Sequence, residues 1–318
     1  MFKRILAPMD RSSLAECVLP HTVAIARAFE SHVTLVHVMD SSSSATWHRA
    51  LDPLNWQIKK AEAEFYLREL TLRLQELGVR TDKHILEGQA AEQVVEFSGA
   101  HNIQLVIVSS HGQSGLSGWN VSSVVQKIIL RVHTSLLIVR AYRPTSTEAT
   151  GLRYRRVLIP VDGSHRAECV LPVARALAHS QETEILLAHV IQRPAIPRRT
   201  RPTREDLELV DRIVGRNRTE TIQYLDELQS QLSGKVETRI LVSDQAAVAL
   251  HELADQEKVD LILLSAHGCS ALSQWPFGSV VSSFINYGTT PLLIIQDLPP
   301  NKIEPTRAEV AAREHGRR

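Results

Sequence analysis

The hydrophobic positions of this chain follow two spacings. Short apolar runs rich in Val, Ile and Leu, such as residues 103–109, are typical of strands buried on both faces. Between them lie segments whose apolar residues recur every three or four positions, as in the stripe over residues 56–77 that Gly78 closes. This alternation of strand and helix predicts parallel sheets with helices on both faces.

The expected strands cover residues 3–8, 32–39, 79–86, 103–109, 135–140, 156–160, 184–190, 236–242, 261–265 and 291–295. The expected helices cover residues 14–29, 56–77, 90–100, 119–131, 166–178, 204–232, 246–256 and 274–287.

The chain contains two related copies of one sequence, which share several short matching segments. Residues 15–20 (AECVLP) recur unchanged at residues 167–172, an offset of 152 positions. Later matches, such as residues 89–91 with 245–247 (QAA), lie 156 positions apart, so about four residues are inserted in the second copy. Such repetition indicates two equivalent domains. We expect a first domain at 1–142, a linker at 143–154, a second domain at 155–298 and a polar tail at 299–318.

The repeat unit defines the expected fold class. Right-handed crossovers between five parallel strands give an α/β, doubly wound domain with strand order 3-2-1-4-5, here present twice. Such sheets bind ligands beyond the carboxyl ends of their strands. The apolar segments 134–140 and 290–296 are last strands that can pair with each other and so protect two sheet edges as an intrachain pseudo-dimer.

Composition narrows the class of protein further. The 318 residues are 43% hydrophobic and 22% charged, with a formal net charge of +1, which is ordinary for a soluble protein. The balance gives no basic excess that would indicate binding to nucleic acid or to a membrane surface. Three cysteines without a CxxC pair, and the lack of a long apolar segment, lead us to expect a cytoplasmic location.

The loop after the fourth strand carries the candidate chemistry. In the second repeat it reads Ser265, two residues, Gly268, nine residues, then Gly278-Ser279. Glycine lets backbone approach an oxyanion closely. The loop ends at a helix amino terminus, where N–H groups and the helix dipole favour negative charge. The first repeat keeps only the middle glycine: it reads Ser109, Gly112 and Ser122-Ser123 at the same spacing.

This spacing resembles that of the universal stress protein family, whose ATP-binding members carry Gly, two residues, Gly, nine residues, then Gly-Ser or Gly-Thr. The resemblance covers both repeats and implies an adenine nucleotide, ATP or else ADP or AMP, with or without magnesium. It places a strand-one carboxylate near the nucleoside and a strand-two backbone against adenine. The implied site comprises Pro160, Val161, Asp162, Val190, Ser265, His267, Gly268, Gly278, Ser279 and Val280, and a weaker first-domain site comprises Asp10, Val38, Ser109, Gly112, Ser122 and Ser123.

Several of these residues have a purely structural alternative. The two aspartates can instead cap the first helix of each repeat. A serine in place of the family's first glycine would be strained by roughly 1–2 kcal/mol if the backbone there has positive φ. His111 and His267 either contact phosphate or only line the loop. We expect no metal site.

We expect a stress-response regulator that binds ATP mainly through its second domain, with unknown protein partners and a homodimer as the preferred assembly. Neither repeat contains GxxxxGK[ST], and no catalytic residue set stands out, so we do not expect an efficient enzyme. The alternative is a universal stress protein that binds no nucleotide and acts through protein–protein interaction. A slow ATP hydrolase is the remaining possibility.

Overall fold

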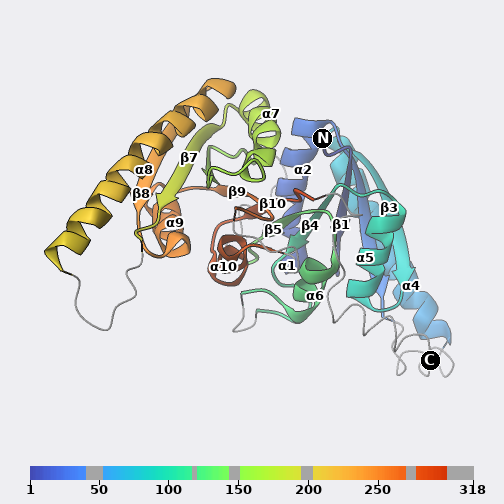
Figure 1. The fold of residues 1–318 in the computed structure, drawn as a ribbon. Helices are drawn as coiled ribbons and strands as arrows, with labels where there is room; N and C mark the ends of the chain where they lie inside the picture. The colour runs from blue at the N-terminus through green and yellow to red at the C-terminus, as the bar shows by residue number, and fades with distance from the viewer. Residues whose placement is uncertain (41–52, 117–119, 143–150, 195–202, 270–276, 299–318) are drawn as a thin grey trace.

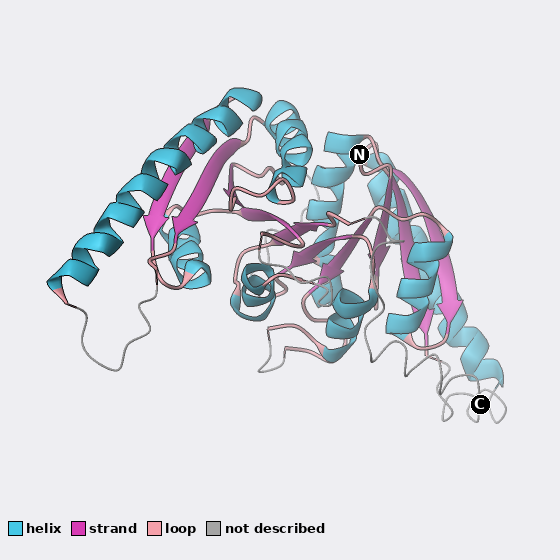
Figure 2. Ribbon diagram, in the orientation of Figure 1, coloured by secondary structure: helices cyan, strands magenta, loops and turns pink. Residues whose placement is uncertain are grey.

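The computed structural model describes residues 1–40, 53–116, 120–142, 151–194, 203–269 and 277–298. Strands and helices alternate along this part of the chain (Figures 1 and 2). The first half of the molecule contains β1 (Arg4–Pro8), α1 (Ser13–Glu16), α2 (Val18–Phe29), β2 (His32–Met39), α4 (Pro53–Glu76), β3 (Arg80–Glu87), α5 (Ala90–Ala100), β4 (Leu105–Ser109), α6 (Ser123–Arg131) and β5 (Ser135–Val139).

The second half repeats this order. It contains β6 (Arg156–Pro160), the 3-10 helix η1 (Ala167–Val170), α7 (Leu171–Gln181), β7 (Glu184–Ile191), α8 (Arg204–Gln231), β8 (Val236–Val242), α9 (Ala246–Gln256), β9 (Leu261–Ser265), α10 (Ser279–Tyr287) and β10 (Leu292–Ile295). Most of the expected linker and the whole expected tail lie outside the described residues, so the domain boundaries stay a prediction.

The ten strands form one continuous sheet in the order β3-β2-β1-β4-β5-β10-β9-β6-β7-β8. Each half therefore has the predicted order 3-2-1-4-5. The halves meet where β5 and β10 pair antiparallel, with Leu137 opposite Leu293, while every other pairing is parallel. The predicted pairing of the two last strands is confirmed, and it merges the two expected sheets into one. A dimer of the whole chain stays a prediction.

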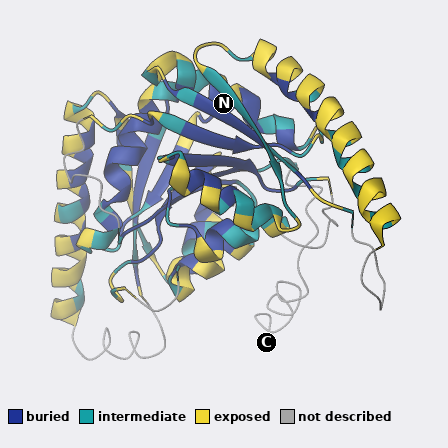
Figure 3. Ribbon diagram, turned by 90° about the vertical axis from the view of Figure 1, so that its left-hand side faces the viewer, coloured by how far each residue is buried: buried dark blue, intermediate teal, exposed yellow. Residues whose placement is uncertain are grey.

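Two helical layers cover the sheet. Ile5 and Ala7 of β1 pack on the side of α2, α4, α7 and α8, whereas Leu6 packs on the side of α5, α6, α9 and α10. The inner strands are buried between these layers, the outermost strands β3 and β8 are mainly partly buried or exposed, and the outer helix faces are exposed (Figure 3). This burial on both faces explains why the central strands lack a polar alternation.

The first helix of each repeat is interrupted where a single helix was predicted. Residues 13–29 divide into α1 and α2, and residues 167–181 divide into η1 and α7. Pro20 and Pro172 explain the division, since proline has no N–H to donate to the carbonyl four residues earlier and its ring crowds that carbonyl. The duplication therefore preserves a break as well as a helix.

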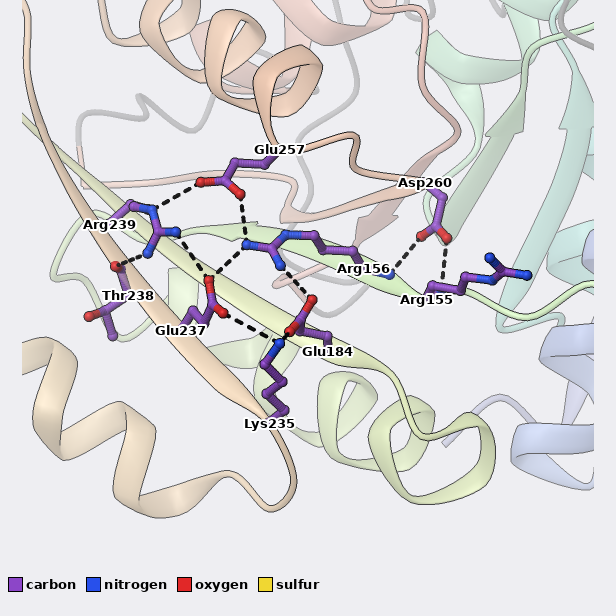
Figure 4. Close-up of polar contacts among 9 residues, drawn as sticks. All are labelled: Arg155, Arg156, Glu184, Lys235, Glu237, Thr238, Arg239, Glu257 and Asp260. Carbon is purple, nitrogen blue, oxygen red and sulfur yellow. Dashed lines mark hydrogen bonds and ion pairs between the residues drawn. The ribbon is translucent and has the colours of Figure 1, made fainter.

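An ion-pair cluster stabilises the amino ends of β6, β7 and β8 (Figure 4). Arg156 contacts Glu184, and its Nη2 lies 2.8 Å from Glu237 Oε2 and 2.7 Å from Glu257 Oε2. Arg239 contacts the same Glu237 and Glu257 at 3.1 and 3.0 Å. The cluster lies at the end of the strands opposite to the one where parallel sheets bind ligands. We therefore assign this ion-pair cluster a structural role.

Candidate functional site

A cavity of about 880 Å³ opens at the carboxyl ends of β6, β7 and β9. Its position is the one where doubly wound sheets bind ligands, and its volume suits a small molecule. Nine of the ten residues expected in the second domain line it: Pro160, Val161, Asp162, Val190, Ser265, Gly268, Gly278, Ser279 and Val280.

The tenth expected residue, His267, does not line the cavity. Its Nδ1 lies 2.7 Å from Oδ1 of Asp297, and both side chains are buried. In the first half, Nδ1 of the buried His111 lies 3.1 Å from Oγ of Ser110. Of the two open interpretations of His267, contact with phosphate therefore gains no support from its position.

Gly278 is the residue that precedes the first turn of α10, and it leaves that turn without a side-chain cap. Its φ of −67° is accessible to any residue. A Cβ atom at this position would have its nearest neighbours at 3.7–3.9 Å, an ordinary contact distance. The fold thus has room for a side chain here. What the glycine preserves is open space and exposed backbone at the positive end of a helix that faces the cavity.

Asp162 joins the loop after β6 to the loop after β9. Its Oδ1 accepts hydrogen bonds from the N–H and hydroxyl of Ser164, at 3.0 and 2.6 Å, and its Oδ2 accepts one of 2.7 Å from the N–H of Cys269. Burial by itself would raise the pKa of Asp162, but these hydrogen bonds outweigh it and hold the pKa below its usual value. A Cβ at Gly268 would lie only 2.3 Å from Oδ2, so this glycine is required for close packing.

The serines two residues after the aspartates also bear on the capping alternative. Oγ of Ser164 accepts a hydrogen bond of 3.2 Å from the N–H of Ala167, and Oγ of Ser12 accepts one of 3.1 Å from Ala15. Ser12 is therefore the N-cap of α1, whereas Ser164 bonds to the first residue of η1, whose N-cap position is Arg166. In each repeat the aspartate orients the serine and holds the second loop.

Ser265 ends β9 in extended backbone, paired with Ile295. Neither it nor Ser109 is among the residues with positive φ, so the strain considered for these serines does not arise. The hydroxyl of Ser265 donates a hydrogen bond of 2.7 Å to the carbonyl oxygen of His267. Ser265 therefore closes the start of the loop at the base of the cavity.

One wall of the cavity was not predicted from the sequence. It is formed by α8, which contributes Asn217, Glu220, Thr221 and Tyr224. A sequence signal for two of them exists, because Glu62 and Tyr66 occupy the same places in α4, 158 positions earlier. The described lining includes carboxylates, among them Asp162 and Glu220, but neither lysine nor arginine.

The first half contains the same loops with different side chains around them. Ser122 precedes α6, and its Oγ accepts a hydrogen bond of 3.4 Å from the N–H of Val125, so this helix start is capped. Arg11 stands where the second half has Gly163, and both have positive φ, at 69° and 82°. The Arg11 Nη2 atom lies 2.8 Å from Oε2 of Glu62. This ion pair spans a space whose counterpart in the second half belongs to the cavity.

The six residues expected in the first-domain site occupy the equivalent strand ends, loops and helix start. Oδ2 of Asp10 accepts a hydrogen bond of 2.5 Å from the N–H of Gln113, and a Cβ at Gly112 would lie 1.9 Å from that oxygen. Val38 lies in β2, Ser109 ends β4, and Ser123 begins α6. A cavity of about 590 Å³ beside α4, lined by Arg11, Ala61, Glu62, Phe65, Tyr66 and Glu69, contains none of the six.

The fold and the cavity define a tandem, doubly wound α/β protein with its candidate site at a switch in strand order. The chain belongs to the universal stress protein family, whose sequence model matches residues 1–140 and again residues 153–296. Among the helices that the structure describes, none is both long and apolar enough to cross a membrane.

Two relatives and one solved structure illustrate the similarity of this chain to other universal stress proteins. Universal stress protein MJ0531 of Methanocaldococcus jannaschii is 26% identical over 146 residues, which is 44% of this chain and 83% of that protein. Universal stress protein Rv2005c of Mycobacterium tuberculosis is 19% identical over 274 residues, covering 82% of this chain and 86% of that protein. The crystal structure of a universal stress protein from Archaeoglobus fulgidus superposes with a TM-score of 0.67 at 15% identity, covering 94% of this chain and all of that one.

Proposed function

We propose that the second half binds an adenine nucleotide, with ATP as the first candidate, in the 880 Å³ cavity. The observation that carries the proposal is Gly278, which leaves the start of α10 uncapped and facing that cavity. Phosphate groups would lie beside Gly278 and against the N–H groups of Ser279 and Val280, where the helix dipole favours anions, because the N–H of Gly278 itself donates a hydrogen bond of 2.8 Å to the carbonyl oxygen of Ala266. The base would lie against Val190 at the end of β7.

The charges of the lining support magnesium as part of the ligand. Asp162, Glu220 and Asp244 line the cavity, and the described lining contains no lysine or arginine. Backbone N–H groups are then the main protein partners of a strongly anionic triphosphate. A divalent cation held by the phosphates would offset their charge, so ATP should bind more tightly with Mg²⁺ than with EDTA.

We further propose that occupancy regulates the protein, and that the chain is not a metabolic enzyme. Asp162, the lining carboxylate on the strand-one loop, already accepts hydrogen bonds from the loops on either side of it. It is therefore committed to holding the site and is poorly placed to act as a general base. A protein that acts only through interaction partners, and a slow hydrolase, are the alternatives that the test separates.

Two measurements test the proposal. Mass spectrometry of material released from the purified protein identifies any retained nucleotide, and calorimetric titration with ATP, with and without Mg²⁺, gives affinity and stoichiometry. We expect one strong site per chain. Gly278→Val should weaken ATP binding at least about 100-fold, equivalent to ~2.7 kcal/mol, because its branched side chain fills the phosphate position.

The matched control is Ser122→Val, which changes the same position in the first half and should leave the strong site intact. If the unmodified protein binds neither ATP, ADP nor AMP, the nucleotide proposal is wrong, and the alternative of a protein that acts only through interaction partners is favoured. Steady release of inorganic phosphate from Mg-ATP would favour the hydrolase. Equal losses in the two variants would contradict the assignment of the site to the second half.

A further inference from the structure

The carboxyl end of α10 is held by side chains from the other half of the molecule. Arg140, which follows β5, is 1% exposed. Its Nη2 donates a hydrogen bond of 2.7 Å to the carbonyl oxygen of Phe284, its Nη1 one of 3.3 Å to Ile285, and its Nε one of 3.5 Å to Thr290. Within the described chain, all its hydrogen bonds go to backbone carbonyls at or just beyond the end of α10.

Asn120 and Tyr142 complete this contact. Nδ2 of Asn120 donates to the carbonyl oxygens of Ile285 and Gly288, at 3.1 and 2.8 Å. The hydroxyl of Tyr142 lies 2.7 Å from Oδ1 of Asn120 and 3.0 Å from the carbonyl oxygen of Gly288. We call Arg140, Asn120 and Tyr142 the clamp.

The clamp satisfies a helix end that would otherwise be costly to bury. The last carbonyls of a helix lack partners within the helix, and they carry the negative end of its dipole. Burial lowers the pKa of Arg140 to about 10, so the guanidinium is still charged at neutral pH. Packing here is close, since a Cβ at Gly288 would lie 3.3 Å from Nη2 of Arg140 and 2.5 Å from the carbonyl oxygen of Phe284.

The residues of the clamp are not repeated in the second half. At the equivalent positions of the second repeat, 156 residues later, Arg140 is replaced by Gln296, Asn120 by Pro276 and Tyr142 by Leu298. None of these side chains carries a charge, and of the three only Gln296 has a hydrogen-bond donor. Asn120 moreover belongs to the first-half loop that corresponds to the candidate phosphate loop. In the first half, this loop therefore contacts the other half of the molecule.

The two ends of α10 connect the clamp with the cavity. The helix has only nine residues, from Ser279 to Tyr287, and a helix this short depends on its tertiary contacts for its order. Its amino end lines the cavity and its carboxyl end is held by Arg140. A shift or fraying of the carboxyl end would displace the N–H groups at the other end.

We propose that the clamp positions the phosphate-binding end of α10, so that the first half controls the affinity of the second half for its nucleotide. Arg140 is the principal positioning residue. The inference rests on the proposed function for the identity of the ligand, but its structural part concerns α10 itself. In this arrangement the first half acts as a built-in regulatory partner of the second.

The test uses Arg140→Gln, which installs the residue found at the equivalent position of the second repeat. Titration with Mg-ATP should show affinity reduced about tenfold, equivalent to ~1.4 kcal/mol. Arg140→Lys keeps the charge but cannot reach three carbonyls, and should recover only part of the loss. Tyr142→Phe removes hydrogen bonds from a half-buried position and should reduce affinity by a smaller factor if Arg140→Gln does not fold.

The matched control is Tyr154→Phe, which removes another hydrogen bond between the halves, of 2.7 Å to Nδ1 of His21, without touching α10. It should lower stability and leave ATP affinity unchanged. Unchanged affinity in a folded Arg140→Gln protein, or equal losses in Arg140→Gln and Tyr154→Phe, would overturn the proposal.

Hydrogen exchange without nucleotide separates this proposal from the proposed function. In Arg140→Gln, amides of the first turn of α10 should exchange faster, while those of the first turn of α6 should not change. Absence of ATP binding in the unmodified protein would refute the nucleotide assignment, and the exchange result would still decide the clamp. Unchanged exchange along α10 would refute the clamp.

Discussion

The two halves of this molecule share one fold but differ at the carboxyl ends of their strands, where the second half has the 880 Å³ cavity. In both, an aspartate after the first strand receives an N–H from the loop after the fourth strand, as Asp10 does from Gln113 and Asp162 from Cys269. The loop framework is therefore common to both. The difference lies in what surrounds it: Ser122 against Gly278 at the helix start, and Arg11 against Gly163 at the turn.

The comparison shows that the candidate site differs from its first-half counterpart by having glycine where the first half has a side chain. Ser122 caps α6 with its own hydroxyl, whereas Gly278 leaves the start of α10 without a side-chain cap. Arg11 spans to Glu62, whereas Gly163 leaves the counterpart of that space open. The first half instead contributes the clamp on α10. Duplication thus permits one copy to support the other.

The largest difference that we predict between the two halves is the effect of pH on stability, and it arises at their junction. His21 and Tyr154 are buried there and share a hydrogen bond of 2.7 Å, whereas the equivalent positions 173 and 2 are Val and Phe. Burial lowers the pKa of His21 to about 4, against 6.5 in an unfolded chain. Below pH 6.5 the unfolded chain binds the proton and the folded one does not, so stability falls with pH until about pH 4.

From pH 7 to pH 5 this single group should remove about 2 kcal/mol from the free energy of unfolding. The double variant His21→Val with Tyr154→Phe installs the residues of the other half and should lose correspondingly less stability over that interval. Urea unfolding of both proteins at the two pH values measures the difference. Parallel losses would show that His21 is not a pH-sensitive element.

Much of the fold could be predicted because its determinants are local or repeated. Continuous apolar strands, helical stripes and the repeat gave the strand order of each half, and the apolar last strands gave the β5–β10 junction. Helix ends were less accurate: the helix expected from residue 119 begins at Ser123, because Ser122 is its cap. Residues 117–119 and 270–276 lie outside the described chain.

The sequence could predict only those residues of the candidate site that lie at strand ends or in the glycine-containing loop. Topology brings Asp162, Val190 and Ser265 to one edge of the sheet, and the glycine spacing identifies the loop. The wall formed by α8 could not be predicted, because a helical stripe identifies the buried face but not the part of the polar face that meets a cavity. Arg140 could not be predicted either, since its partners lie about 145 residues away along the chain.

A second prediction exchanges the helix-start residues of the two halves. Gly278→Ser gives α10 the cap that α6 has, which should stabilise the helix start but compete with phosphate for the same N–H groups. We expect ATP affinity of the strong site to fall about tenfold, or ~1.4 kcal/mol, with no loss of thermal stability. Calorimetric titration and thermal unfolding measure the two effects.

The reciprocal variant Ser122→Gly is the control for this exchange. It uncaps α6 but leaves the Arg11–Glu62 ion pair in place, so it should not create a strong second site. Two equal sites per chain in Ser122→Gly would mean that the cap alone closes the first half. Unchanged affinity in Gly278→Ser would mean that the helix start does not bind the ligand.

The smallest predicted effect concerns Arg11 itself. A side chain at a φ of 69° is strained by roughly 1–2 kcal/mol, and the partly exposed ion pair with Glu62 returns at most about 1 kcal/mol. Arg11→Gly should therefore raise the free energy of unfolding by up to about 1 kcal/mol, while Gly163→Arg, at a φ of 82°, should lower it by a similar amount and place a charge beside Glu220 in the cavity. Urea unfolding gives both values, and ATP titration of Gly163→Arg shows whether the new side chain also obstructs the site. A stability loss in Arg11→Gly would mean that the ion pair with Glu62 outweighs the backbone strain at residue 11, so that Arg11 occupies its space through a favourable contact.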